Sequence, residues 1–409
     1  MQHELIPHLF RQEYSKIVAV LCRRFGFDQI EIAEDIAADT FLVAAQTWGL
    51  SGLPANPIAW LYSVAKNKAK NQLQRQTVLD TKVTPELQDG TPLTYQAEID
   101  LSEANIKDSQ LQMMFAICHP AIAPEAQIGL SLRILCGFGI DEIADAFLTN
   151  KDTINKRLYR AKQKLRTGRI NIAFPDSNEI DQRLENVLTT IYLLFNEGYY
   201  SVSKKQTINK ELCFEAIRLC HILVEHERTN RPEVNALLAL MYFHSSRFDA
   251  RIDKNGELIL YGEQDVELWD YELIRKGVMF LNRSATGERL SKYHLQGTIA
   301  YWNTQKTDTA EKWENILDLY NRLLQIDYSP IAALNRTYAL SKVQGKPTAI
   351  VEAEKLKLQS NHFYYALLGD LYTGVDNVIA AEHFQNALTL AITHTDKNTM
   401  RRKLKGVDN

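Results

Sequence analysis

The residues whose types and spacing most clearly suit a chemical task lie between positions 151 and 169. Eight of them are Lys or Arg, and Asp152 is the one acid in this stretch. Cations at this density suit phosphate oxygens, whose negative charge they neutralise. Thr153 and Asn155 stand among these cations and carry hydrogen-bonding groups of the kind that read base edges. The segment therefore predicts contact with nucleic acid, and the alternative interpretation is a solvated basic face on an ordinary helix.

Two short helices are expected to position these side chains. The first is amphipathic and carries apolar residues at helical spacing, namely Ile140, Ile143, Ala144 and Phe147. The pattern breaks at residues 148–150, and a second, basic helix begins behind the break. A helix pair of this kind is typical of a helix-turn-helix, which lays its second helix in the DNA major groove.

A second group of cations lies on the helix expected over residues 58–75. This helix opens with Trp60, Leu61 and Tyr62, and its second half carries Lys and Arg with no acid among them. Aromatic rings interleaved with cations suit melted DNA, because unstacked bases find rings and phosphates find ammonium groups. The alternative is that Trp60 and Leu61 belong to the core and that only the lysines are solvated. We place Trp60 in the core.

Acids mark the helix expected over residues 31–48. Glu34 and Asp35 lie near its start, and Asp39 follows one turn later. Outward carboxylates of this kind suit a basic partner helix. Acids early in a helix also favour its dipole, and this simpler reason has equal weight.

The overall charge limits these interpretations. The chain has 409 residues and a formal net charge of -3, which argues against a uniformly basic nucleic-acid binder. Residues 1–170 carry 19 basic and 19 acidic side chains, so any charge that serves DNA binding is local.

Several features exclude other classes of protein. The five cysteines show no CxxC spacing and are expected to be buried thiols in a reducing cytoplasm. The N-terminus has no secretory signal, and no apolar run approaches the roughly 18 residues that a membrane span needs. No Walker lysine loop, GxSxG elbow or HExxH motif occurs. We expect a soluble, cytoplasmic protein that is not an enzyme, binds no metal or cofactor and has no membrane partner.

Shifts in composition divide an all-α chain into domains. Residues 1–76 are expected to be helical, and residues 77–109 form an acidic linker with seven acids and two lysines. Residues 110–170 contain the helix-turn-helix, and residues 179–409 form a long helical domain. In that domain, residues 333–340 and 366–373 form a weak repeat with an offset of 33, which is typical of tetratricopeptide (TPR) helix pairs. A small β-hairpin is expected at residues 251–260.

The order of these pieces resembles the extracytoplasmic-function (ECF) sigma factors of the bacterial sigma-70 family. The resemblance rests on AEDIAADTFLVAAQTW (33–48), on NPIAWLYSVAKNKAKNQLQRQ (56–76) and on the helix-turn-helix. Segments such as NEGYY (196–200) and SPIAALNRTYAL (329–340) are similar to the C-terminal extension of one ECF subgroup, which has a TPR-like domain. The resemblance implies two partners, core RNA polymerase (its β′ and β subunits) and promoter DNA.

The resemblance also assigns roles to individual residues. The residues that would dock on the clamp helices of β′ are Glu34, Asp35, Asp39 and Phe41. Those that would face the -10 element are Ser51, Asn56, Lys66, Asn67, Lys70, Asn71 and Arg75, the first two within a loop (49–57) that would capture a flipped base. Those that would bind the -35 element are Lys151, Thr153, Asn155, Lys156, Arg157 and Arg160. The acidic linker matches the segment that threads through polymerase.

The sequence thus predicts an RNA polymerase sigma factor that directs promoter recognition and transcription initiation. The C-terminal half would regulate it in cis and would bind a protein or peptide partner. One rival is a helix-turn-helix regulator with a TPR sensor, which would bind DNA without polymerase and would not need residues 31–75. A second rival is a repeat scaffold that binds proteins only. A hydrolase or transferase is disfavoured because the C-terminal half lacks a convergent nucleophile and base.

Overall fold

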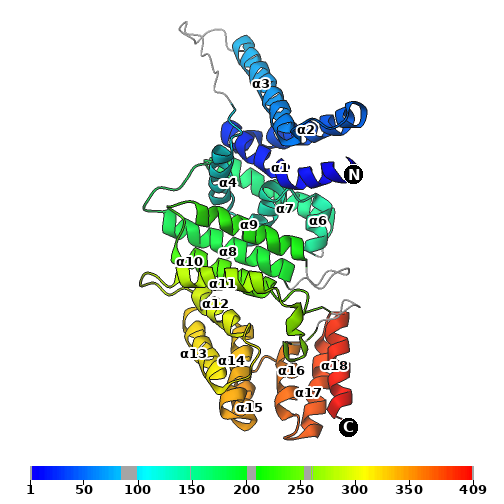
Figure 1. The fold of residues 1–409 in the computed structure, drawn as a ribbon, viewed down its shortest axis with the longest axis vertical. Coiled ribbons are helices and arrows are strands. Elements are labelled where there is room, and N and C mark those ends of the chain that lie inside the picture. The colour runs from blue at the N-terminus through cyan, green and yellow to red at the C-terminus, as the bar shows by residue number, and fades with distance from the viewer. Residues whose placement is uncertain are drawn as a thin grey trace. The chain divides into compact units, whose positions relative to one another are not determined.

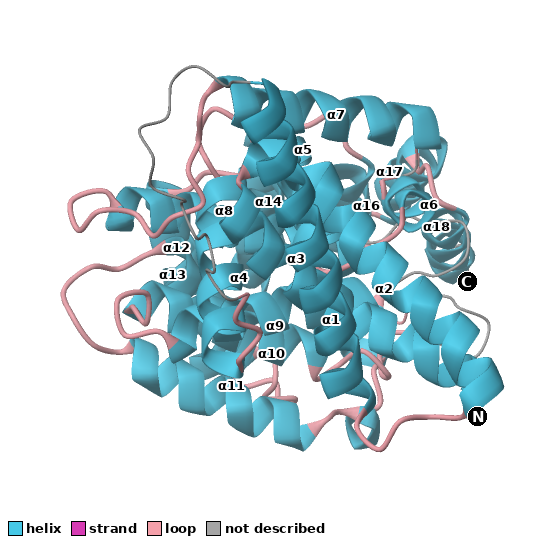
Figure 2. Cartoon of the chain, turned by 90° about the horizontal axis from the view of Figure 1, so that it is seen from above, coloured by secondary structure: helices cyan, strands magenta, loops and turns pink. Residues whose placement is uncertain are grey.

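A computed structural model of the chain describes residues 2–83, 99–147, 149–199, 209–252, 259 and 261–407. Every regular element in these ranges is a helix, which confirms the predicted all-α class (Figures 1 and 2). None of these helices is long and apolar enough to cross a membrane. The hairpin expected at 251–260 falls mainly on residues 253–258 and 260, which lie outside the described residues.

The helices form two compact units, residues 1–197 (unit 1) and 198–409 (unit 2). Unit 1 contains α1 (Gln2–Phe25), α2 (Ile30–Ser51), α3 (Pro57–Val83), α4 (Glu103–Ile117), α5 (Pro124–Leu130), α6 (Ile140–Ala146), α7 (Lys151–Thr167) and nearly all of α8 (Ile180–Tyr199). A short 3-10 turn, η1 (Phe27–Gln29), precedes α2, and a π-helical turn, η2 (Ser131–Leu135), follows α5. The helix-turn-helix expected from the sequence corresponds to α6 and α7.

Helix α1 is the centre of unit 1. It packs against α2 on one side and against α4 on another. Its residues Ile17, Val18 and Leu21 are buried there, as are Met113 and Met114 of α4. The helices before residue 84 and those after residue 98 therefore share one hydrophobic core, although the sequence suggests two domains joined by a linker.

The boundaries of unit 1 differ from those expected. The predicted linker, 77–109, is helical at both ends, since α3 continues to Val83 and α4 begins at Glu103 with Ser102 as its N-cap. Helix α8, expected in the C-terminal domain, belongs to unit 1. Arg183 of α8 donates a hydrogen bond to the Phe115 carbonyl (2.7 Å), and the Thr190 hydroxyl donates one to Gln127 Oε1 (2.8 Å). The second compact unit begins at residue 198, and the functional domain boundary expected at residue 179 stays a prediction.

Unit 2 is a series of helices that pack in chain order. Its helices are α9 (Lys210–Glu225), α10 (Pro232–Ser245), α11 (Tyr271–Ser284), α12 (Lys292–Trp302), α13 (Ala310–Ile326), α14 (Pro330–Gln344), α15 (Lys346–Lys355), α16 (His362–Tyr372), α17 (Asn377–Leu390) and α18 (His394–Val407). Two 3-10 turns, η3 (Tyr261–Glu263) and η4 (Val266–Leu268), precede α11. Each helix from α9 to α18 contacts the next, and α10 also contacts α12 while α14 contacts α16. Most contacts within unit 2 are therefore made between helices that follow one another in the chain.

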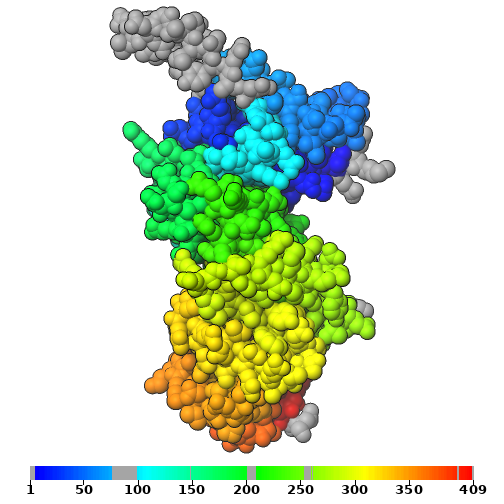
Figure 3. All heavy atoms as spheres, turned by 60° about the vertical axis from the view of Figure 1, so that its left-hand side comes forward, coloured from blue at the N-terminus to red at the C-terminus, as the bar shows by residue number. Residues whose placement is uncertain are grey.

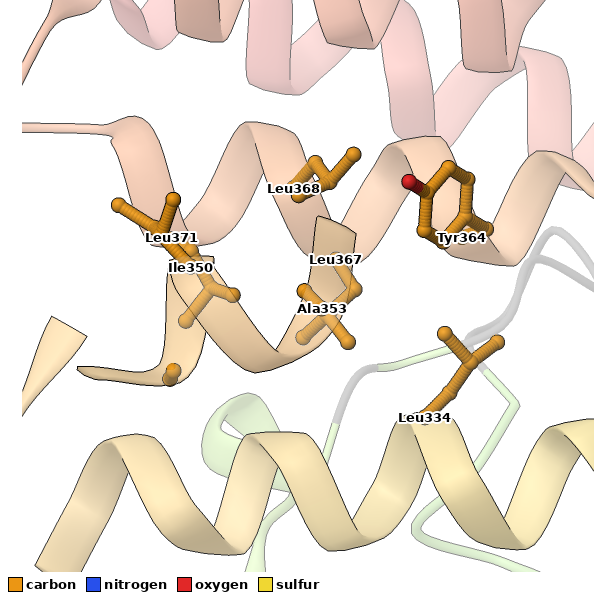
Figure 4. Packing of buried hydrophobic residues seen from close by; sticks show 8 residues of the cluster. Leu334, Ile350, Ala353, Tyr364, Leu367, Leu368 and Leu371 are labelled. Carbon is orange, nitrogen blue, oxygen red and sulfur yellow. The ribbon is translucent and has the colours of Figure 1, made fainter. Parts of the chain in front are cut away.

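The core of unit 2 is built from consecutive helices. Leu334 of α14, Ile350 of α15 and Leu368 of α16 meet in one buried cluster (Figure 4). In the space-filling view, the atoms of the segments coloured yellow and orange form one continuous surface (Figure 3). The five cysteines are buried thiols within the two units, as the sequence predicts.

Candidate nucleic-acid interface

Helix α7 carries the residues predicted to bind the -35 element. Its amphipathic pattern determines which of its side chains point outward. The Asn150 side chain caps the helix by accepting a hydrogen bond from the Thr153 amide (2.8 Å). The residues that α7 buries are Ile154, Leu158, Ala161 and Leu165, spaced three or four apart. The opposite face is therefore free to meet a partner.

Four of the six side chains predicted to bind the -35 element lie on this outward face. They are Lys151, Asn155, Lys156 and Arg160, all of which are exposed. Lys151 also forms an exposed ion pair with Asp141 of α6 (2.6 Å). Such a pair is screened by solvent, so it leaves Lys151 available to a phosphate.

The other two predicted residues of α7 have structural contacts. Thr153 is half-buried beside the capping residue. Arg157 is also half-buried, and its guanidinium lies 5.4 Å from the centroid of the Phe147 ring at the end of α6. Sequence reasoning missed Tyr159, which is 61% exposed on the outward face. Its position four residues after Asn155 was the available signal, because residues four apart share a helix face.

Two of the last three cations of α7, Lys162 and Arg166, turn inward, toward α2. Lys162 Nζ lies 2.5 Å from Glu34 Oε2, and Arg166 forms an ion pair with Glu31. Arg166 Nε also donates a hydrogen bond to the Phe27 carbonyl (3.1 Å). The basic segment is therefore divided between an outward face and an inward one.

Helix α3 presents a second outward polar face. Leu61, Ala65 and Ala69 are buried at a spacing of four residues, which aligns the remaining positions on the solvent side. The predicted -10 residues that this leaves exposed are Asn67, Lys70, Asn71 and Arg75, with Lys66 half-buried. Ser63 and Gln74, which the sequence reasoning missed, are exposed on the same helix.

Helix α3 is held in place by hydrogen bonds and aromatic contacts at its first turns. The Tyr62 hydroxyl donates a 2.5 Å hydrogen bond to Glu13 Oε2 of α1. Burial and this bond both raise the pKa of Tyr62, so the phenol stays a donor across the physiological range. Trp60 is half-buried, and its ring packs edge-on against that of the buried Trp48 at 5.3 Å. This contact fits the expected core role of Trp60.

The loop before α3 offers fewer polar groups than its predicted role requires. Asn56 Oδ1 accepts a hydrogen bond from the Ala59 amide (3.0 Å), so this side chain serves as the helix cap. Ser51 is exposed at the end of α2. A large apolar side chain nearby is strongly exposed, since Leu50 is 91% exposed. Of the two residues of this loop predicted to read bases, Asn56 therefore caps α3, and Ser51 presents an exposed hydroxyl at the end of α2.

The four residues predicted to dock on polymerase differ in how far they are exposed to solvent. Asp35 and Asp39 are exposed on α2, and Asp39 pairs with Lys68 at 3.3 Å. Glu34 is only 8% exposed, and Phe41 is a core residue whose ring lies 5.0 Å from that of Phe10. Leu42 is 55% exposed on the face that carries Asp35 and Asp39, and the sequence reasoning missed it. The accessible face of α2 is therefore acidic with one large apolar side chain.

Within the part of the chain that the structure describes, no group of three or more His, Cys, Asp or Glu side chains is placed to hold a metal ion. The arrangement of α2, α3 and α7 suits binding to an extended polyanion and to a partner protein.

Comparisons with known proteins define the class. Residues 9–78, which include α2 and most of α3, match the family model of Sigma-70 region 2. Residues 183–285 match a family of unknown function (DUF6596). The chain therefore contains a Sigma-70 region 2 segment, which supports membership of the sigma-70 family.

Two relatives extend this result. The uncharacterized protein R00370 of Rhizobium meliloti (strain 1021) is 31% identical over 384 residues, which are 92% of this chain and 90% of that protein. The chain belongs to the same family as that protein. The RNA polymerase sigma factor YlaC of Bacillus subtilis (strain 168) is 26% identical over 169 residues, which are 41% of this chain and 93% of YlaC. No solved structure matches the chain.

Proposed function

We propose that the chain is a sigma factor of the ECF type, which directs core RNA polymerase to promoters and initiates transcription without an enzymatic activity of its own. The observation that carries this proposal is the pairing of two faces within the matched region 2. Helix α2 exposes the acidic and apolar side chains Asp35, Asp39 and Leu42. Helix α3 exposes the amides and cations that suit DNA. A protein that must bind polymerase and promoter together needs both.

Each helix has a stated role in this proposal. The face of α3 neutralises phosphates of the -10 element, and its amides contact bases or backbone there. The outward face of α7 enters the major groove of the -35 element, where Asn155 and Arg160 reach base edges. Asp35, Asp39 and Leu42 contact a basic helical surface of the polymerase β′ subunit.

The test is promoter-dependent transcription with purified core polymerase and the full chain. Asp35→Arg reverses an exposed charge on α2 and should weaken co-elution with polymerase and reduce transcription. The matched control is Glu314→Arg, which reverses an exposed charge on α13 in unit 2. Equal transcription by the two variants contradicts the proposed docking face.

The same experiment separates the rival function. A polymerase-independent helix-turn-helix regulator would bind duplex DNA alone through α7 and would be indifferent to Asp35→Arg. DNA binding without polymerase, together with no co-elution, would favour that rival.

The proposal assigns regulation in cis to the C-terminal half. Stacked helix pairs of the TPR type present an extended surface to a protein or peptide, and the packing order of unit 2 supports this assignment. Because α8 belongs to unit 1, the informative truncation ends at residue 197. Promoter output from residues 1–197 should differ from that of the full chain, and identical output contradicts regulation by unit 2.

A further inference from the structure

Two lysines of unit 2 hold the segment that contains η3 and η4. Lys306 Nζ donates hydrogen bonds to the carbonyl oxygens of Tyr261 and Gln264, both at 3.0 Å. Lys312 Nζ donates to the Tyr261 hydroxyl (3.0 Å) and to the Gln305 carbonyl (2.6 Å). All of these acceptors are uncharged oxygens. Dipoles therefore solvate the two ammonium groups, and neither forms an ion pair with a residue that the structure describes.

A third cation lies beside these lysines. Arg247 is buried, and its guanidinium lies 5.4 Å from the centroid of the Tyr261 ring. The ammonium groups of Lys306 and Lys312 lie 5.3 and 5.1 Å from the same centroid. Three positive charges therefore surround one aromatic ring, and two of them, on Arg247 and Lys312, are buried.

Carboxylates near this cluster remain in contact with solvent. Asp308 pairs with Lys342 at 3.2 Å, and its side chain is more than half exposed. Burial lowers the pKa of Lys312, the Asp308 carboxylate opposes this shift, and the Lys342 and Arg247 cations add to it. The acids of the segment itself are all exposed, namely Glu263, Asp265, Glu267 and Asp270. Among the described residues of unit 2, no Asp or Glu side chain is buried, so the buried charge here is positive.

Two buried polar atoms beside the cations have no hydrogen-bond partner among the described residues. They are Nε1 of Trp269, which is a donor, and Oε1 of Gln264, which is an acceptor. Trp269 is 4% exposed and Gln264 is 7% exposed. The other end of the Gln264 amide donates to the Ile259 carbonyl at 3.3 Å, which favours this orientation of the amide. Buried donors and acceptors are nearly always paired, so these two atoms indicate a polar molecule at this place.

Ring contacts bring the unpaired donor and the cations together. The Trp269 ring lies 6.5 Å from the Tyr261 ring, centroid to centroid. The Arg247 guanidinium lies 6.0 Å from the Trp269 centroid, so it is close to both rings. Gln264 is tied to the same place because its own carbonyl accepts from Lys306. A donor, an acceptor and an excess of positive charge are thus gathered around Tyr261.

We propose that Arg247, Gln264, Trp269 and Lys312 form a binding site for a small hydroxycarboxylate anion. The Trp269 N–H donates to a carboxylate oxygen, and the cations of Arg247 and Lys312 stabilise its charge. Gln264 Oε1 accepts a hydrogen bond from the hydroxyl group of the ligand. An ammonium group in place of that hydroxyl would be repelled by the cations. The burial of both unpaired atoms limits the ligand to a small molecule that the segment can enclose.

This inference goes beyond the proposed function and does not depend on it. Arg247, Gln264 and Trp269 lie within the stretch that matches the family of unknown function, and Lys312 follows it. The site therefore assigns a chemical role to a part of the chain that the comparison with Sigma-70 region 2 does not cover.

The first experiment measures thermal unfolding of the full chain, without polymerase or DNA, against increasing concentrations of sodium lactate. Sodium chloride at the same ionic strength is the reference. A ligand that binds only the folded chain raises Tm, and the dependence on concentration gives its Kd. We expect a saturable rise with lactate, a Kd about tenfold weaker for acetate, which lacks the hydroxyl, and no saturable rise with glycine. No saturable rise with lactate would show that water alone occupies this place, and would overturn the proposal. A saturable rise with phosphate but not with lactate would overturn the assignment of a carboxylate.

The second experiment locates the site. Trp269→Phe keeps the ring and removes the N–H, so it should weaken lactate binding about tenfold, as expected for a lost hydrogen bond to a charged group. Trp302→Phe is the matched control, because it removes the same N–H from a half-buried tryptophan of α12. Equal lactate affinity in these two variants would overturn the proposal.

A variant of Gln264 tests the site independently if Trp269→Phe fails to fold. Gln264→Met has a similar shape and lacks the acceptor, so it should weaken lactate binding and leave acetate binding unchanged. Lactate binding equal to that of the parent chain would overturn the role of Gln264 and, with it, the assignment of a hydroxycarboxylate.

Discussion

The guanidinium of Arg157 lies 5.4 Å from the centroid of the Phe147 ring, so that α7 uses one of its cations to pack on the end of α6. Arg160, one turn later, is exposed. The two arginines have the same chemistry and lie three residues apart, yet one is part of the contact between the two helices and the other faces solvent. Substitution of Arg157 should therefore affect mainly stability, and substitution of Arg160 should affect mainly DNA binding.

We expect Arg157→Ala to lower the free energy of unfolding by about 0.5–2 kcal/mol, because it removes a cation-π contact and the packing of the side-chain stem. Arg160→Ala should leave stability nearly unchanged and should weaken DNA binding. It should also reduce the slope of log affinity against log salt concentration by about 1, as expected for one lost phosphate contact. Urea unfolding and DNA titration at several salt concentrations measure both effects. An unchanged salt slope for Arg160→Ala argues against its contact with DNA.

Phe41 and Leu42 are adjacent on α2 but should respond in opposite ways. Phe41 is 5% exposed and packs against Phe10, so Phe41→Ala should lower the free energy of unfolding by about 3–5 kcal/mol. Leu42 is more than half exposed, so Leu42→Ala should change stability by less than about 0.5 kcal/mol. The Leu42 variant should nevertheless co-elute less with core polymerase. Normal co-elution of that variant would remove Leu42 from the proposed docking face.

The helices were predictable because their determinants are local. The spacing of Ile154, Leu158 and Ala161, with Asn150 as cap, specifies α7 from the sequence alone. The cap role of Asn56 had a signal as well, since Asn followed by Pro57 is the usual start of a helix.

The partners of the side chains were not predictable in this way. Glu34 and Lys162 are 128 residues apart in the chain, and no periodic pattern around either one indicates the other. The burial of Glu34 follows from that distant contact. Composition alone does not reveal the helical ends of residues 77–109, where α3 continues to Val83 and Ser102 caps α4. A solvated helix end and an extended segment have similar compositions.

Gly369 in α16 marks a close approach between helices of unit 2. A Cβ atom at this position would lie 2.5–2.8 Å from atoms of the Phe384 ring in α17. Gly369→Ala should therefore lower the free energy of unfolding by about 1–3 kcal/mol through overpacking. Gly406→Ala in α18 is the control, because nothing lies within 4 Å of its Cβ position. There the higher helix propensity of Ala should stabilise the chain by up to about 1 kcal/mol. Loss of stability at both positions would point to backbone effects in place of the contact with Phe384.

His244 of α10 gives unit 2 a defined response to acid. Its ring is half-buried, with Nδ1 3.1 Å from the Tyr199 hydroxyl, and desolvation together with the nearby Arg247 lowers its pKa to about 3. In the unfolded chain the imidazole has its ordinary pKa of about 6.5. Above pH 6.5 the ring is neutral in both states, and this contribution to stability is complete. Below pH 6.5 the unfolded chain binds a proton that the folded chain excludes.

The free energy of unfolding should therefore fall by about 1.4 kcal/mol per pH unit between pH 6.5 and pH 3 on account of His244 alone, or by about 2 kcal/mol at pH 5. Burial also lowers the pKa of His221, His294 and His383, which act in the same direction. His244→Gln removes one titrating group. The free energy of unfolding of this variant should therefore change less with pH than that of the parent chain, by the equivalent of about one bound proton. Urea unfolding at pH 7.5, 6.0 and 5.0 measures this difference. Parallel pH profiles for the two proteins would mean that His244 binds its proton in the folded chain as readily as in the unfolded one.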